Sequence, residues 1–177
     1  MTCGLGIVEA KTVLLAADSA AASLKNPEIY SLKTTKVFRI GSYGIVYTTS
    51  YRLGQILRYE TELPEPPQQD LERFMATAFV SSIRRSLEAA GFDRGLGEHG
   101  SILVGVSGQL FTIGAELQVA SEATPYAAVG AGRYVAYGAL YALEGSGKPA
   151  RERAEIALRA AQKFCPVVRE PFVFVQV

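Results

Sequence analysis

The sequence predicts an α+β domain in which two β-sheets pack face to face and helices cover their outer sides. Three observations support this class. The expected elements come in blocks, namely four strands, two helices, several strands, two helices and a last strand, rather than in βαβ alternation. Several strands are apolar on both faces, as strands between two layers are. Because no repeat, low-complexity tract or linker interrupts the 177 residues, we expect one domain over residues 1–177.

The first block begins with four expected strands. They span residues 3–9, 12–17, 35–40 and 43–49. The second run is apolar throughout and ends at Asp18, which predicts a strand that is covered on both sides. Small and polar residues, with Asn26-Pro27 among them, predict a loop from Ser19 to about Leu32.

Helical spacing then replaces the strand pattern. Apolar residues three and four apart predict a helix from about Leu53 to Glu60, and the prolines at 64–67 end it. Asp70 is expected to cap a second helix, which has a long apolar face and ends near Gly91.

The second block follows a glycine-rich loop at residues 95–100. Two apolar runs, 102–106 and 109–113, flank Ser107-Gly108 and predict a β-hairpin. The remaining expected elements are strands at 117–120 and 126–129, helices at 132–143 and 150–164, and a strand at 172–175. We expect each block to form its own sheet and to supply its own pair of helices.

The composition excludes several kinds of chemistry. Lys and Arg total 18 against 17 Asp and Glu, and a net charge of +1 gives no electrostatic basis for binding nucleic acid or an anionic membrane. One His and two Cys cannot supply most zinc sites and barely supply a histidine-based triad, so we expect no metal and no cofactor. Since neither a signal-peptide pattern nor a run of 18 apolar residues occurs, we expect a cytoplasmic protein.

A nucleophile that needs no histidine is available at the start of the chain. The small Thr2 permits removal of Met1, and the freed α-amine could then take the proton of the Thr2 hydroxyl. The pKa of such an amine, about 7.7–8.0, leaves part of it neutral at pH 7. Asp18 and Lys36 could form an ion pair nearby, in which the lysine cation would lower the pKa of the amine. Taken singly, each of these residues fits an ordinary chain start or strand end better.

Other residues with reactive character fit structural roles. The turn at residues 130–132 lacks the third glycine of a dinucleotide fingerprint, which favours close backbone packing instead. Cys3 could act as a nucleophile only if Thr2 were removed as well, and Cys165 fits a packed thiol. His99 is expected to be exposed and to have no chemical role.

Thr2 and the segments 15–19 and 35–37 resemble the β-type proteasome subunits and the bacterial HslV-type peptidase. The segment 15–19 follows Thr2 at the family's spacing without a gap, and residues 35–37 follow after a short insertion. Residues 126–132, followed by Tyr137-Gly138, are similar to the family's strand, turn and helix. The resemblance implies the αββα sandwich of the N-terminal nucleophile hydrolases, with two mainly antiparallel sheets flanked by helix pairs.

For the site, the resemblance implies a threonine endopeptidase that forms an acyl-enzyme on Thr2, with Asp18 and Lys36 as partners. The backbone N–H near Ser50 would lie in the oxyanion hole. The pocket would be lined by Thr34 and Thr48, which favour a small or neutral substrate side chain. The turn beside the nucleophile would be Gly130, Ala131 and Gly132.

The resemblance also implies assembly. Family members enclose their sites in rings, so we expect a polypeptide substrate, a homo-oligomeric ring and a possible AAA+ ATPase unfoldase as partner.

Three departures from the family pattern bear on activity. Ala131 stands where the family usually has a serine, and Ser50-Tyr51 replaces its glycine pair before the first helix. Residues 165–168 lack the Asp and Ser that many proteasome β-subunits carry there. Two alternatives therefore stay open, namely a catalytically silent ring or scaffold subunit and a hydrolase of small amides on the same fold.

Overall fold

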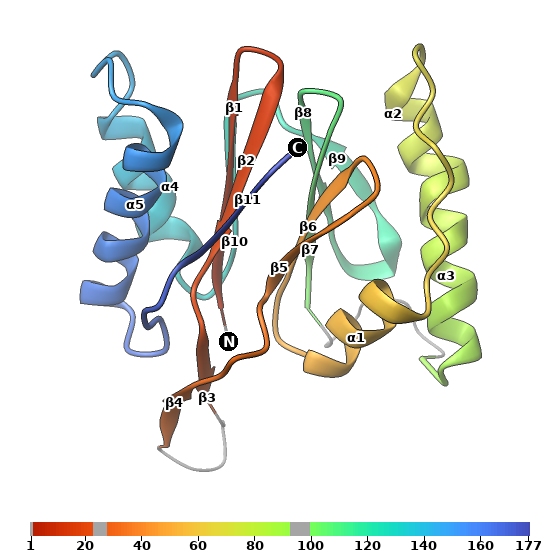
Figure 1. Cartoon of the computed structure of the whole chain (residues 1–177), viewed down its shortest axis with the longest axis horizontal. Helices are drawn as coiled ribbons and strands as arrows, with labels where there is room; N and C mark the ends of the chain where they lie inside the picture. The colour runs from red at the N-terminus through yellow and green to blue at the C-terminus, as the bar shows by residue number, and fades with distance from the viewer. Residues whose placement is uncertain (1, 23–27, 93–99) are drawn as a thin grey trace.

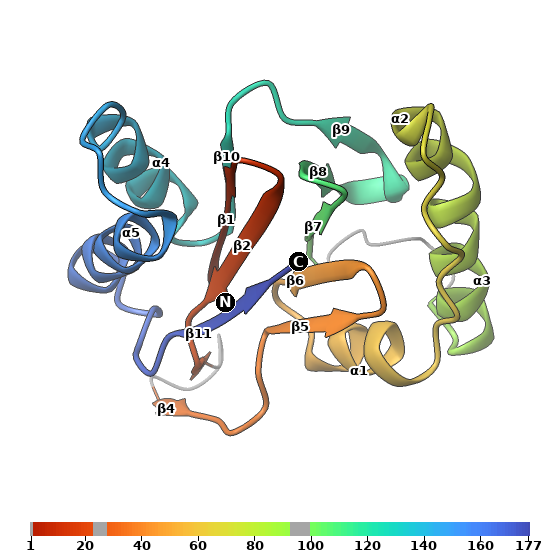
Figure 2. The same ribbon diagram turned by 45° about the horizontal axis from the view of Figure 1, so that its top comes forward.

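The computed structural model describes residues 2–22, 28–92 and 100–177, which form layers in the order helix, sheet, sheet, helix (Figure 1, Figure 2). The predicted α+β class and the two packed sheets inside flanking helices are thereby confirmed. Met1, Asn26-Pro27 and residues 95–99, which include His99, lie outside the described residues. No described helix has the length and apolar character needed to cross a membrane.

The first sheet joins the two ends of the chain. Its antiparallel order is β10-β1-β2-β11. The strands span Cys3–Glu9 (β1), Thr12–Ala17 (β2), Tyr126–Gly130 (β10) and Val173–Gln176 (β11). Its outer face is covered by α4 (Arg133–Ala142) and α5 (Ala150–Phe164). Buried alanines on α5, at positions 150, 154, 157 and 161, let that helix lie close to the sheet.

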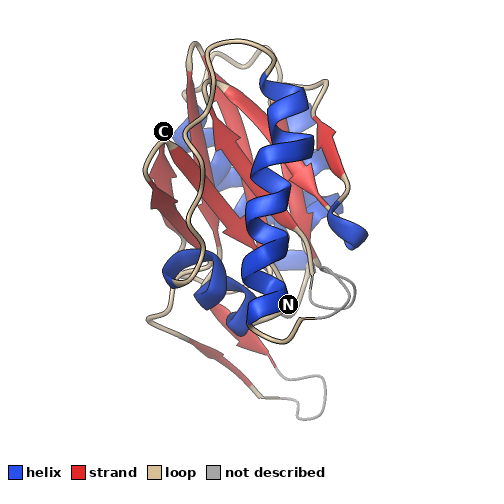
Figure 3. Ribbon diagram, turned by 90° about the vertical axis from the view of Figure 1, so that its right-hand side faces the viewer, coloured by secondary structure: helices blue, strands red, loops and turns tan. Residues whose placement is uncertain are grey.

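The second sheet is built from the middle of the chain. Its antiparallel order is β5-β6-β7-β8-β9. The strands span Val37–Ile40 (β5), Tyr43–Tyr47 (β6), Ile102–Val106 (β7), Gln109–Ile113 (β8) and Val119–Ser121 (β9), with a 3-10 turn at Ala115–Leu117. Its outer face is covered by α1 (Tyr51–Tyr59) and by α2 (Leu71–Phe74), which runs through a π-helical turn (Met75–Phe79) into α3 (Val80–Ala89) (Figure 3).

The two sheets meet through a third apolar cluster. It includes Leu15 from β2, Val46 from β6 and Leu103 from β7, and all three side chains are fully buried. At Gly6 the sheets approach so closely that an added Cβ would lie 2.6 Å from Cδ2 of Leu110. This contact between sheets is the reason that β1 and β2 are apolar on both faces.

One prediction about sheet composition is wrong. The blocks do not form separate sheets, because β1 and β2 pair with β10 and β11, whereas β5 and β6 pair with β7. A strand pairs with the edge that matches its buried faces and register, and that edge can belong to a distant part of the sequence.

Two local predictions also need correction. The expected loop from Ser19 to Leu32 contains a small antiparallel pair, β3 (Ala20–Ala22) and β4 (Ile29–Ser31), which extends beyond the end of the first sheet in Figure 1. Strands of three residues are too short to produce a periodic signal. Asp70 precedes α2 but its side chain caps nothing, because its backbone is left-handed at φ 56° whereas a capping residue is normally extended.

Candidate active site

Antiparallel pairing of β1 and β2 brings the start of the chain beside Asp18. Gly4 lies opposite Ala17, and one step further the N–H of Asp18 donates to the carbonyl of Cys3 at 3.1 Å. Thr2 and Asp18 therefore lie at the same end of neighbouring strands. Lys36 is the residue directly before β5, and its side chain extends to this same end. The side chains of Thr2, Asp18 and Lys36 are all buried.

Asp18 and Lys36 form a buried ion pair. The Nζ of Lys36 lies 3.0 Å from Oδ1 of Asp18, and this oxygen also accepts the backbone N–H of Cys3 at 2.9 Å. The other oxygen, Oδ2, accepts the N–H of Ala20 at 3.0 Å and that of Arg169 at 3.4 Å. Burial lowers the pKa of Lys36, and the Asp18 carboxylate partly opposes this change. The carboxylate thus joins the lysine to the backbone directly after Thr2.

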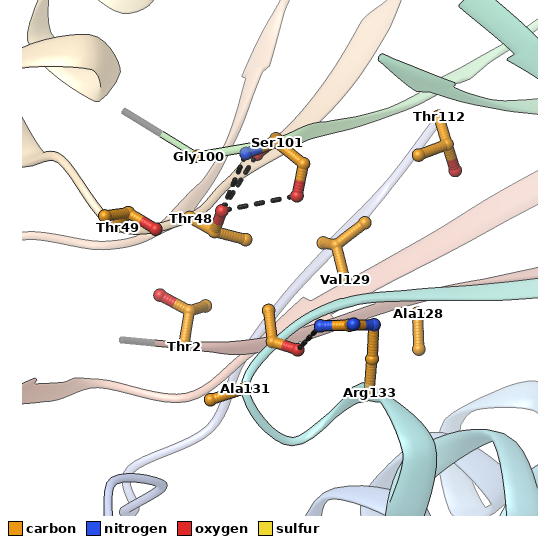
Figure 4. Close-up of a pocket in the computed structure, with 11 residues that line it drawn as sticks. Thr2, Thr48, Thr49, Gly100, Ser101, Thr112, Ala128, Val129, Ala131 and Arg133 are labelled. Atoms are coloured by element: carbon orange, nitrogen blue, oxygen red, sulfur yellow. Dashed lines mark hydrogen bonds between the residues drawn. The ribbon is translucent and has the colours of Figure 1, made fainter. Parts of the chain in front are cut away.

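Thr2 lines a cavity of about 490 Å³ at this end of the sheets. Figure 4 shows the Thr2 side chain facing Thr48 and Thr49 across it. The described residues that line the cavity are Thr2, Thr48, Thr49, Gly100, Ser101, Thr112, Ala128, Val129, Gly130, Ala131 and Arg133. A threonine hydroxyl is therefore placed at a space that a small molecule or a peptide side chain could enter.

The turn after β10 fits closely around Thr2. Gly130 has φ 88°, and a Cβ at this position would collide with the Thr2 carbonyl, so both conformation and space require glycine there. The N–H of Gly132 donates to the same carbonyl at 3.3 Å. Ala131 lies between them, is exposed at the cavity, and contributes a methyl group and no hydroxyl.

The remaining predicted residues are not all at this cavity. Thr48 lines it, but its Oγ1 accepts the N–H of Ser101 at 2.8 Å and contacts the Ser101 hydroxyl at 3.3 Å. Thr34 lines a separate, much smaller hollow beside Tyr47 and α1. Ser50 caps α1, with its side chain accepting the N–H of Leu53, and its own N–H donates to the Thr48 carbonyl at 2.8 Å. The Ser50 N–H is therefore occupied in this structure.

The sequence analysis missed Thr49, which lies between Thr48 and Ser50. Thr49 lines the cavity, is exposed, and has φ 68°. A positive φ is strained for a β-branched residue. Among the described residues, none accepts a hydrogen bond from the Thr49 N–H. No sequence signal could have found this conformation, since threonine favours extended backbone.

Replacing Thr49 with glycine is expected to stabilise the protein by about 0.5–1 kcal/mol. The left-handed backbone costs a residue with a Cβ about 1–2 kcal/mol, and the greater freedom of glycine in the unfolded chain offsets part of the gain. Urea unfolding of the wild type and Thr49→Gly measures the difference. Thr77, which is exposed but has no positive φ, supplies the matched control, and Thr77→Gly should destabilise. A loss of stability in Thr49→Gly would show that the threonine side chain has a stabilising contact.

The thiol of Cys3, beside the nucleophile, is expected to be unreactive. Burial, together with the Asp18 carboxylate, raises the pKa of Cys3 to about 12, and the residue is fully buried. Iodoacetamide at pH 8 should therefore modify the partly exposed Cys165 in the native protein and reach Cys3 only after unfolding. Peptide mass mapping measures both sites, and equal rates at the two thiols in the native state would contradict this expectation.

Comparison with known proteins gives matches only at the level of structure. Neither the scan against protein-family models nor the search of curated proteins finds a match. Among solved structures, BPH from Thiobacillus denitrificans in complex with epoxomicin superposes with a TM-score of 0.80 at 21% identity, over 99% of this chain and 98% of that one. HslV from Trypanosoma brucei superposes with a TM-score of 0.71 at 22% identity, over 99% of this chain and 98% of the HslV chain. Anbu, an ancestral beta-subunit, from Yersinia bercovieri superposes with a TM-score of 0.67 at 13% identity, over 99% of this chain and 81% of the Anbu chain.

These likenesses extend over nearly the whole chain, so the resemblance inferred from Thr2, Asp18 and Lys36 is confirmed for the fold. Sequence identities of 13–22% support a shared fold, but they do not assign an activity to this chain. The chain has the fold of the proteasome-type N-terminal nucleophile hydrolase subunits.

Proposed function

We propose that this protein is a threonine endopeptidase that uses Thr2, after removal of Met1, as its nucleophile. The observation that carries the proposal is the buried Asp18–Lys36 pair, whose carboxylate also holds the backbone N–H of the residue after Thr2. Thr2 itself lines the cavity. A nucleophile, a nearby cation and an adjoining space together fit acyl transfer better than a purely structural role.

In the proposed reaction the α-amine of Thr2 takes the proton from the Thr2 hydroxyl, and Oγ1 attacks the carbonyl carbon of the peptide. The amine then gives this proton to the leaving nitrogen as the C–N bond breaks, which leaves an ester on Thr2. Water, activated by the same amine, hydrolyses the ester and restores the hydroxyl. Lys36 would keep the pKa of the amine low through its charge, and Asp18 would hold Lys36 in position.

We propose Thr49, rather than Ser50, as the oxyanion donor. The Ser50 N–H is used by the Thr48 carbonyl, whereas the Thr49 N–H has no acceptor among the described residues and belongs to a residue at the cavity. An N–H that no other group occupies can stabilise the developing charge without breaking another hydrogen bond.

We further propose that the protein acts in the cytoplasm as a self-compartmentalising homo-oligomeric ring, with an AAA+ ATPase as a possible partner. The fold likeness supports the ring, and so do large exposed aromatic side chains on α4 and at the end of α5, namely Tyr134, Tyr141 and Phe164. Native mass spectrometry tests it, because a closed ring favours proteolysis whereas a dimer favours the alternative of a small-amide hydrolase.

Epoxomicin labelling tests the nucleophile directly. The reagent is bound in a structure of the similar BPH, and its epoxyketone needs both a free amine and a hydroxyl on one residue. Intact mass and peptide mapping should show loss of Met1 and a single adduct on Thr2, with no adduct on Thr2→Ala. A protein that retains Met1 in the cell, or an adduct at another residue, would overturn the proposal.

A catalytically silent ring subunit is the second candidate. It is favoured by the methyl group of Ala131 at the cavity and by the occupied N–H of Ser50. Ring formation without any epoxomicin adduct would support this candidate over the peptidase.

A further inference from the structure

Arg133 brings a positive charge to the cavity that contains Thr2. Among the described residues that line this cavity, Arg133 is the only charged one. It is the first residue of α4, and Figure 4 shows its side chain reaching back from the helix to the end of β10. An ionic group has a large influence on the choice of ligand in a cavity whose other described lining residues are small or neutral.

The guanidinium of Arg133 is held in place but retains free donors. Its Nη1 donates to the Gly130 carbonyl at 3.2 Å, and its Nη2 donates to the Tyr134 hydroxyl at 2.8 Å. The guanidinium also lies over the Tyr134 ring, 4.2 Å from its centre. Two of its five N–H groups are thus used, and no carboxylate of the described chain lies within ion-pair distance. An anion that enters the cavity would meet an oriented cation.

Helix stability does not explain this arginine. The N-terminal end of a helix is positive, so a cation in the first turn is unfavourable, and α4 has no acidic residue in that turn to compensate.

The sequence predicted that Thr34 and Thr48 would select the substrate side chain, but the structure gives these two residues little part in that selection. The Thr48 hydroxyl is already bonded to Ser101, and Thr34 lies in another hollow.

We propose that Arg133 determines specificity by binding a carboxylate of the substrate close to the bond that Thr2 attacks. The carboxylate can belong to an acidic side chain or to the free C-terminus of a short peptide. Arginine binds carboxylates through two parallel N–H donors, which matches the unused groups on this guanidinium. The proposal rests on the peptidase function proposed above, and its test separates the two.

Binding is measured first, in the non-cleaving Thr2→Ala chain, by fluorescence anisotropy of four labelled hexapeptides. They differ only in Glu or Gln at one position and in a free or amidated C-terminus. The charged form should bind about 10- to 100-fold more tightly, which is the range for a charge-assisted hydrogen bond that solvent partly screens. Preference for Glu identifies a side chain as the source, and preference for the free acid identifies the C-terminus.

Variants assign that preference to Arg133. Arg133→Gln keeps a donor for the Gly130 carbonyl and should abolish the preference, whereas Arg133→Lys should retain much of it. Arg84→Gln, on the exposed face of α3, removes the same charge elsewhere and should change nothing. Equal binding of all four peptides, binding of none of them, or a preference that survives Arg133→Gln would overturn the proposal.

Cleavage by the chain with Thr2 intact then separates this proposal from the peptidase function. Cleavage of all four peptides at equal rates would refute the role of Arg133 and leave the peptidase standing. An Arg133-dependent binding preference with no cleavage and no epoxomicin adduct would refute the peptidase and leave the carboxylate site.

Discussion

Replacing Thr2 with alanine is expected to lower the rate of peptide hydrolysis by at least about a thousand-fold. The change removes the hydroxyl that would attack the peptide, and no other described nucleophile lines the cavity with an α-amine as its base. The rate constant for cleavage of a fluorogenic peptide measures the effect. Thr2→Ser keeps the hydroxyl and amine and should retain measurable turnover.

The Thr2→Ala variant is expected to remain folded. Thr2 is buried, but its side chain forms no hydrogen bond with the described residues. The substitution therefore removes only the packing of one methyl group and one hydroxyl group. An unfolding midpoint close to that of the wild type would assign the loss to chemistry. More than a few per cent of the wild-type rate in Thr2→Ala would rule out Thr2 as the nucleophile.

The second large effect is expected on stability. Asp18→Ala should reduce the free energy of unfolding by about 3–5 kcal/mol, the usual cost of breaking a buried ion pair by removing one member. Lys36 would lose its carboxylate, and three backbone N–H groups, those of Cys3, Ala20 and Arg169, would lose an acceptor. Urea unfolding at pH 7 measures the change. The double variant Asp18→Ala/Lys36→Met removes the charge as well and should recover part of the loss.

The deficit of Asp18→Ala is also expected to shrink as the pH rises. Burial already lowers the pKa of Lys36 below its ordinary value of 10.5, and removing Asp18 removes the charge that opposes this. Between the folded-state pKa and 10.5 the unfolded chain then binds more protons than the folded one, so stability rises with pH. Unfolding at pH 7 and at pH 9.5 checks the sign. A deficit that grows with pH, or a loss below about 1 kcal/mol at pH 7, would mean that the ion pair is unimportant for stability.

Much of the architecture follows from local pattern. The hairpin at 102–106 and 109–113 and the helix at 150–164 are confirmed at both ends, since a Ser-Gly turn and helical spacing are signals within a few residues. The three-residue strands β3 and β4 leave no such signal. The pairing of β1 and β2 with β10 and β11 depends on contacts between residues more than a hundred positions apart, which no local pattern encodes.

The candidate site likewise has residues that the sequence indicated and residues that only the tertiary structure placed there. The order and spacing of Thr2, Asp18 and Lys36 drew attention to them through a family resemblance, and each alone fits an ordinary chain. The tight turn between β1 and β2 explains why residues 2 and 18 lie together. Only folding decides that Thr34 leaves the cavity, that the Ser50 N–H is occupied, and that Thr49 and Arg133 enter it. These outcomes depend on backbone angles and on the packing of the two sheets, which places the turn after β10 and the loop after β6 at one cavity. Such contacts form between segments distant in sequence, so they exist only once both sheets are assembled.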